Sequence, residues 1–101
     1  MAYILKKFYN SFNDLAILKK LGNLYNSQNK NSEALLYYGK YLESNQNDAE
    51  IYFNMSAIYF SYKNLPKAFE NIKRCLEINP NYPNAQRIYN GLASMYTKKA
   101  K

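Results

Sequence analysis

The chain has 101 residues, of which 48% are hydrophobic, and its 14 Lys+Arg against 7 Asp+Glu give a formal net charge of +7. This length suits one small domain with its own hydrophobic core. Because the chain contains no histidine and a single cysteine, it excludes a histidine general base, a Cys–His nucleophile pair and an internal disulfide. No run of about 18 apolar residues occurs, so we expect no membrane-spanning helix.

The first half of the chain predicts three helices, because apolar residues recur there at helical rather than alternating spacing. One helix lies within residues 1–13. A second covers residues 14–28, and the side chain of Asn13 or Asp14 is expected to accept the free N–H groups of its first turn. A short polar break then separates it from a third helix over residues 32–45.

The second half predicts further helices with clearer boundary signals. Asn47 or Asp48 is expected to cap a helix that runs to about Tyr62. Asn64 is expected to cap the next one, which carries Pro66 in its first turn, where the missing N–H of proline costs nothing. The sequence therefore favours short helices joined by tight connections.

Two further prolines mark helix boundaries in the last part of the chain. The fifth helix is expected to end before Pro80, since the residue that precedes a proline avoids helical geometry. A sixth opens at Pro83 and has no partner helix after it. The fold class is thus all-α, with about six helices.

Seven positions recur with a spacing of 34 residues, which is the strongest signal in the chain. A fixed period of about 34 is typical of a helix–turn–helix repeat. Each isolated helix would be marginally stable, and stacking of the pairs supplies the stability. The seven pairs are Leu18/Tyr52, Leu21/Met55, Gly22/Ser56, Tyr25/Tyr59, Ala34/Ala68, Tyr38/Ile72 and Tyr41/Cys75.

These residues resemble the tetratricopeptide-repeat family, whose pattern is a bulky residue, Leu-Gly and Tyr on the first helix, Ala and an aromatic on the second, and a closing proline. Pro80 closes the second unit, whereas Gln46 stands in the corresponding place of the first, and neither unit has the family's tryptophan. The resemblance implies a right-handed α-solenoid of antiparallel helix pairs in a single domain. Its parts would be a half-repeat helix over 1–13, repeats over 15–48 and 49–82, and a terminal helix and tail over 83–101.

Small residues are expected where the two helices of a unit approach closely. Gly22 and Ser56 occupy such positions, and we expect them to face Ala34 and Ala68. Cys75 also occupies a small-residue position on an inner helix face. It is therefore expected to be a buried, inert thiol.

The sequence gives no support for catalysis or for a cofactor. Asp48 and Glu50 lie close together, but both fall in the first turn of a helix, where negative charge offsets the helix dipole. The spacings of a metal site are absent, and the three glycines stand alone rather than in a phosphate-binding loop. We expect a non-enzymatic protein without a metal or cofactor.

The family resemblance implies that the first helix of each unit lines a concave groove that binds an extended segment of a partner protein. Phe53 and Phe60 lie seven residues apart, so they share one helix face, and exposed aromatics mark binding sites. The alternative is that they cover a neighbouring helix. The candidate groove residues are Lys19, Asn23, Asn26, Phe53, Asn54, Ala57, Phe60 and Arg87.

Part of this set resembles the carboxylate clamp of chaperone-binding members of the family. Lys19, Asn23 and Asn54 match its first three places. Its last two places fall on Asn84 and Ile88, and neither is basic. A looser site for an acidic or polar segment is therefore favoured over a true clamp.

Other functions stay open at this point. The incomplete ends suggest either a fragment of a longer array or a self-associating module. The basic pI of about 9.4 allows nucleic-acid binding, but the basic residues are spread along the chain and no recognised nucleic-acid motif occurs. The single cysteine fits a reducing compartment, so we expect a cytoplasmic location.

Overall fold

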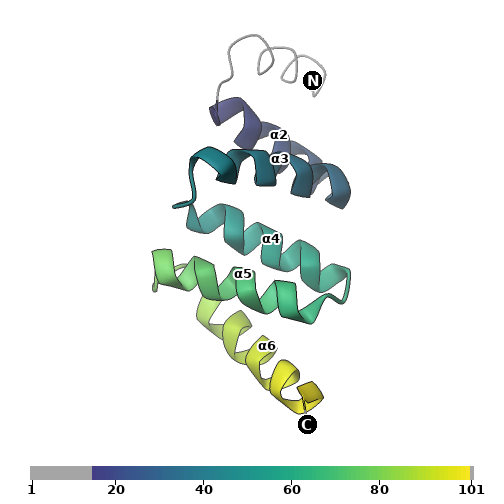
Figure 1. The fold of residues 1–101 in the computed structure, drawn as a ribbon, viewed down its shortest axis with the longest axis vertical. Helices are drawn as coiled ribbons and strands as arrows, with labels where there is room; N and C mark the ends of the chain where they lie inside the picture. The colour runs from purple at the N-terminus through teal and green to yellow at the C-terminus, as the bar shows by residue number, and fades with distance from the viewer. Residues whose placement is uncertain (1–14, 101) are drawn as a thin grey trace. The chain divides into compact units, whose positions relative to one another are not determined.

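The computed structural model describes the backbone of residues 15–100 and the side chains of residues 15–95, and every regular element in this part of the chain is an α-helix. The predicted all-α class is thereby confirmed, while the helix predicted over 1–13 lies outside the described residues. Figure 1 shows the five helices, which are α2 (Leu15–Ser27), α3 (Asn31–Ser44), α4 (Ala49–Ser61), α5 (Leu65–Ile78) and α6 (Ala85–Ala100).

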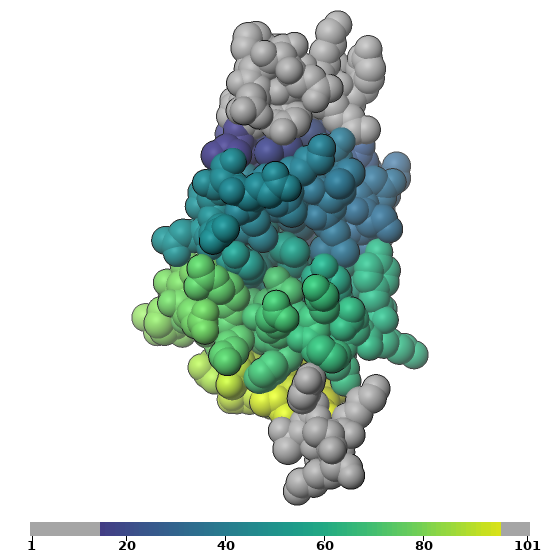
Figure 2. All heavy atoms as spheres, in the orientation of Figure 1, coloured from purple at the N-terminus to yellow at the C-terminus, as the bar shows by residue number. Residues whose placement is uncertain are grey.

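The helices form two compact units, with the division between Gln46 and Asn47. In the first unit, α2 packs against α3 as a hairpin. In the second, α5 packs against both α4 and α6. Figure 2 shows the side chains of α5, in green, facing the viewer as a continuous surface. The repeated helix pair is thus confirmed, and the right-handed superhelix that would relate the units stays a prediction.

The turn that joins the two helices of each hairpin has the same geometry in both units. Asn29 and Lys63, which lie 34 residues apart, have φ angles of 60° and 61°. The next N–H donates back across the turn in each case, from Lys30 to the carbonyl of Tyr25 and from Asn64 to that of Tyr59, both at 2.9 Å. These are the bonds of a Schellman motif, which ends a helix and satisfies its last carbonyls. The 34-residue period is therefore a period of backbone structure as well as of sequence.

The predicted caps hold in part. Asn64 caps α5 by accepting the Lys67 N–H at 3.2 Å, and Pro66 lies in the first turn, as expected. Asp48 occupies the N-cap position of α4, but its side chain makes no cap hydrogen bond. The proposed capping role of Asp48 is therefore wrong, while its position is right. The caps proposed at Asn13 and Asp14 lie outside the described residues.

The last helix begins two residues later than the sequence predicts. Asn84 has a φ of 67°, in the left-handed region, so it cannot continue a right-handed helix that starts at Pro83. Asparagine tolerates this conformation better than most residues. The helix consequently starts at Ala85, whose side chain is fully buried.

The two hairpins bury equivalent positions but fill them differently. A Cβ atom on Gly22 would lie 2.5 Å from both Cδ1 and Cε1 of Tyr38, so the Tyr38 ring lies directly against the backbone of α2. In the second hairpin, the Ser56 hydroxyl donates to the Ala68 carbonyl oxygen at 2.7 Å, and Ile72 replaces the tyrosine. Gly22 therefore accommodates the Tyr38 ring, a contact that the sequence did not predict, and Ser56 meets Ala68 as predicted.

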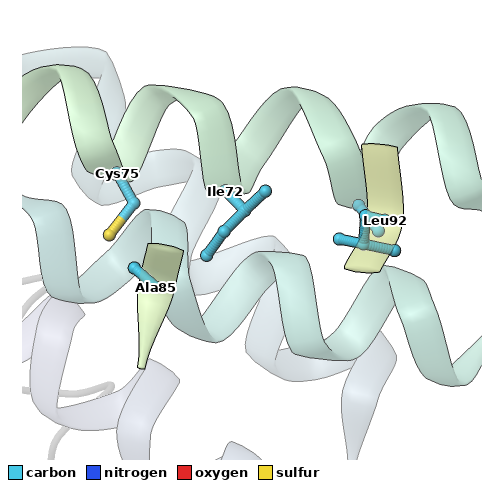
Figure 3. Packing of buried hydrophobic residues seen from close by; sticks show 5 residues of the cluster. Ile72, Cys75, Ala85 and Leu92 are labelled. Atoms are coloured by element: carbon cyan, nitrogen blue, oxygen red, sulfur yellow. The ribbon is translucent and has the colours of Figure 1, made fainter. Parts of the chain in front are cut away.

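The core of the second unit joins α5 to α6. Figure 3 shows Ile72 and Cys75 on α5 with Ala85 and Leu92 on α6, and Ala68 completes this cluster. Ile72, Cys75, Ala68 and Ala85 are fully inaccessible to solvent. The ring of Phe69 packs on that of Tyr89 with their centroids 5.1 Å apart. This core holds α6 on α5 and so fixes the surface that α6 presents beside α4.

Candidate interaction site

A pocket of about 320 Å³ opens in the second unit between α4 and α6, which we call the α4–α6 pocket. Both helices contribute residues at the spacing i, i+3, i+4 and i+7, so each wall is one face of a helix about two turns long. The lining is almost wholly apolar. Its residues are Phe53, Ser56, Ala57 and Phe60 from α4, and Ile88, Gly91, Leu92 and Met95 from α6.

The α4 wall contains both aromatic residues that the sequence singled out. The ring of Phe53 packs on that of Tyr82, with centroids 5.0 Å apart, so Phe53 is half-buried and partly covers the connection before α6. Phe60 is 49% exposed. Phe53 also packs against the core cluster of α5 and α6, so the alternative that these aromatics cover a neighbouring helix is met in part by Phe53, whereas Phe60 is half exposed.

The α6 wall ends in a second exposed apolar residue. Met95 is 44% exposed and, with Phe60, also lines a further cavity beside the α4–α6 pocket. That cavity additionally contacts Ser61, Lys63 and Leu65. Since the two cavities share Phe60 and Met95, they form one apolar surface whose centre is this pair.

One basic residue lines this surface, and another lies on α6 one turn before the pocket residue Gly91. Lys63 lines the second cavity, and Arg87 is exposed on α6 one turn before Gly91, with its Nη2 donating to Asn84 Oδ1 at 3.3 Å. Helix α6 has no aspartate or glutamate anywhere in its sequence. Among the described residues, no acidic side chain lines either cavity.

The other predicted groove residues fall in different places. Lys19, Asn23 and Asn26 lie on α2 in the first unit, where Asn23 Oδ1 accepts a hydrogen bond from the Tyr38 hydroxyl at 2.6 Å. Asn23 therefore serves the packing of its own hairpin. Asn54 is half-buried on α4 and does not line the α4–α6 pocket.

The sequence missed most of the α6 wall. Ile88 and Leu92 belong to the apolar stripe of the last helix, and that stripe predicts burial rather than a binding surface. Met95 continues them at i+7, in the same pattern as Phe53, Ala57 and Phe60. The sequence signal that could have revealed this wall is the same spacing of apolar residues on the two helices.

Among the residues that the structure describes, no group of three or more His, Cys, Asp and Glu side chains could hold a metal ion. Within the same part of the chain, no helix has the length and apolar character needed to cross a bilayer.

Cys75 has the environment of an inert thiol. Burial raises the pKa of the Cys75 thiol to about 11, because the core disfavours the charged thiolate. The folded-state pKa lies above the unfolded one, so this thiol contributes stability below pH 9 that is lost as the pH rises through about 11.

We therefore expect a thiol-reactive dye to label the native protein very slowly at pH 8, and to label the urea-unfolded chain rapidly. Labelling at equal rates in both states would contradict the buried position. Native-state stability measured by urea denaturation should also fall as the pH is raised above 9.

The comparisons with known proteins agree with the repeat seen in the structure. Residues 49–82 match the family model described as a tetratricopeptide repeat. The chain is 31% identical over 87 residues to the Hsp70-Hsp90 organising protein of Plasmodium falciparum, which covers 82% of this chain and 15% of that protein. It is 28% identical over 64 residues to Hsp70-Hsp90 organizing protein 3 of Arabidopsis thaliana, covering 63% of this chain and 12% of that protein.

A third relative belongs to a different assembly. The anaphase-promoting complex subunit CDC16 of Saccharomyces cerevisiae is 29% identical over 74 residues, which covers 73% of this chain and 9% of that subunit. The chain thus spans only a small part of the length of these relatives. The period of 34 residues, the two equivalent hairpins and the match over 49–82 lead to one conclusion: the chain belongs to the tetratricopeptide-repeat family.

Proposed function

We propose that the second unit is a docking site for a segment of a partner protein, which inserts a bulky apolar side chain into the α4–α6 pocket. The observation that carries this proposal is the exposed pair of Phe60 and Met95 at the centre of an apolar surface. The family match and the relatives support a protein–protein interaction scaffold, and the groove assignment is our more specific proposal.

Burial of this surface supplies the affinity. Removing apolar area from water stabilises a complex by roughly 25 cal/mol per Å², and aromatic anchors in a pocket commonly dominate interface energetics. Phe60 has about half of its surface available for a partner to cover. A pocket of about 320 Å³ has room for one or two large side chains of that partner.

The charge around the pocket selects the partner. Lys63 lines the adjoining cavity, Arg87 is exposed on α6 one turn before Gly91, and the described part of the chain places no carboxylate in the lining of either cavity. An acidic segment would be attracted and a basic one repelled. Exposed charges are screened over about 10 Å at moderate salt, so this selection should weaken as the ionic strength rises.

We further propose that the chain is non-enzymatic, since the matching family and its relatives point to binding rather than catalysis. The parts suggested by the sequence, with a half-repeat before residue 15 and a terminal helix after residue 82, are retained as the proposed organisation. A reducing compartment such as the cytoplasm suits the single buried cysteine.

The test uses short synthetic peptides in which leucines are surrounded by glutamates, with binding to the chain followed by fluorescence anisotropy. We expect the acidic leucine peptide to bind, and Phe60→Ala to weaken it about tenfold or more, as for a central aromatic anchor. Two control peptides replace the leucines by serines or the glutamates by lysines. Leu36→Ala, which shortens a 53% exposed leucine on α3, is the control variant.

The outcomes separate the alternatives. Equal binding of Phe60→Ala and the unmodified chain would contradict docking in the α4–α6 pocket. If Phe60→Ala instead changed the mass measured by light scattering, the pocket would be a contact between copies of the chain. Retention on heparin that disappears at modest salt would indicate attraction by net charge alone.

A further inference from the structure

Gly91 is an unexpected residue in the middle of α6. Glycine inside a helix is less favourable than alanine by about 0.5–1 kcal/mol, because it loses more backbone freedom on folding. A close neighbour would explain it, as the Tyr38 ring explains Gly22. A Cβ built on Gly91, however, meets no atom within 4 Å. Packing within the described residues therefore gives no reason for this glycine.

Gly91 lies in the wall of the α4–α6 pocket, where its neighbours are large. Ile88, Leu92 and Met95 surround it on α6, so the glycine forms a notch in an otherwise bulky wall. Ala57 is also small and exposed, and it lies in the middle of the α4 wall. The pocket is thus lined by small residues at its middle and by Phe60 and Met95 at one end.

Gly91 also shares a helix row with Arg87 and Met95, since the three are spaced at i, i+4 and i+8. Neighbours at i and i+4 lie about 6 Å apart on a helix surface, so the row measures about 12 Å. An extended chain covers that length in about four residues at roughly 3.3 Å per residue. Along this row a partner would therefore meet the positive charge of Arg87, then the gap at Gly91, and then the apolar side chain of Met95.

We propose that Gly91 is the point at which the bound acidic segment brings its main chain against the backbone of α6. In this arrangement a carboxylate of the segment pairs with Arg87, and a bulky apolar side chain about four residues away packs on Met95 and Phe60. This inference rests on the proposed docking function. It adds the spacing of the recognised residues and the role of Gly91 in specificity.

The test is Gly91→Ala, with Gly39→Ala as its matched control. Gly39 lies inside α3, a Cβ on it also meets nothing within 4 Å, and it lines none of the cavities described above. The probe is a synthetic acidic peptide with a glutamate and a phenylalanine four residues apart, and a second peptide places them side by side. Dissociation constants come from fluorescence anisotropy, and melting temperatures from circular dichroism.

We expect Gly91→Ala to weaken binding of the spaced peptide about tenfold while its melting temperature stays level or rises, because alanine is the better helix former. Gly39→Ala should leave binding unchanged. The peptide with adjacent residues should bind more weakly than the spaced one to the unmodified chain.

Failure of the Gly91 inference and failure of the docking function would give different results. If Gly91→Ala binds as tightly as the unmodified chain while Phe60→Ala binds poorly, the close approach at Gly91 is wrong and the docking function stands. A lower melting temperature for Gly91→Ala would show that the unbound helix already requires glycine, which also overturns the inference. If no peptide binds the unmodified chain, the docking function itself fails.

Discussion

Ile72→Ala is expected to lower the free energy of unfolding by about 2–5 kcal/mol, the range for truncating a fully buried aliphatic side chain. Ile72 is fully buried in the cluster that holds α6 on α5, together with Cys75 and Ala85. Removing three carbons there loses their transfer free energy and leaves a cavity that the packed helices refill only in part. Urea denaturation followed by circular dichroism measures the change.

Two variants bracket that result. Ile72→Val removes one methyl group and should cost about 0.5–1.5 kcal/mol. Leu36→Ala truncates a leucine that is 53% exposed, so its effect should stay within about 0.5 kcal/mol. Equal losses for Ile72→Ala and Leu36→Ala would show that the α5–α6 cluster does not form the core of the second unit.

Gly22→Leu is expected to destabilise the first hairpin by about 1–3 kcal/mol. A side chain at this position would place its Cβ 2.5 Å from two carbons of the Tyr38 ring, a distance at which either the ring or one of the helices must move. The ring cannot easily turn away, because it is fully buried and its hydroxyl donates to Asn23. The gain of about 1 kcal/mol in helix propensity offsets only part of this cost.

The control for this variant is Gly39→Leu, at a glycine where a Cβ meets nothing within 4 Å. It should leave the melting temperature level or raise it. The double variant Gly22→Ser/Tyr38→Ile copies the pair found in the second hairpin and should recover part of the loss. An unchanged melting temperature for Gly22→Leu would argue against the close approach of α2 and α3.

The sequence predicted the helices well because their signals are local. Apolar spacing located α2 to α5 to within one or two residues, and Asn64 with Pro66 marked the start of α5 correctly. The start of α6 was misplaced because the left-handed conformation of Asn84 depends on its turn and leaves no pattern in the apolar stripe.

The candidate site was harder to predict from the sequence than the helices were, because it depends on contacts between helices. The spacing of Phe53 and Phe60 placed them on one face, and the structure puts both in one pocket. Periodicity could not reveal that Phe53 leans on Tyr82, or that Leu92 is buried in the core while it borders the pocket. The sequence pattern of an apolar stripe is the same whether the helix buries that stripe in the core or exposes it to a partner.

The two hairpins fill equivalent core positions with different side chains, so a helix of one hairpin cannot replace the equivalent helix of the other. Pairing α4 with α3 would set the Ser56 side chain where the Tyr38 ring needs a bare backbone, and pairing α2 with α5 would leave the space above Gly22 to the smaller Ile72. A chimera built from this chain should therefore be spliced between hairpins, never within one. The unit that evolution or an engineer can shuffle is the complete pair, with its glycine and tyrosine or its serine and isoleucine kept together.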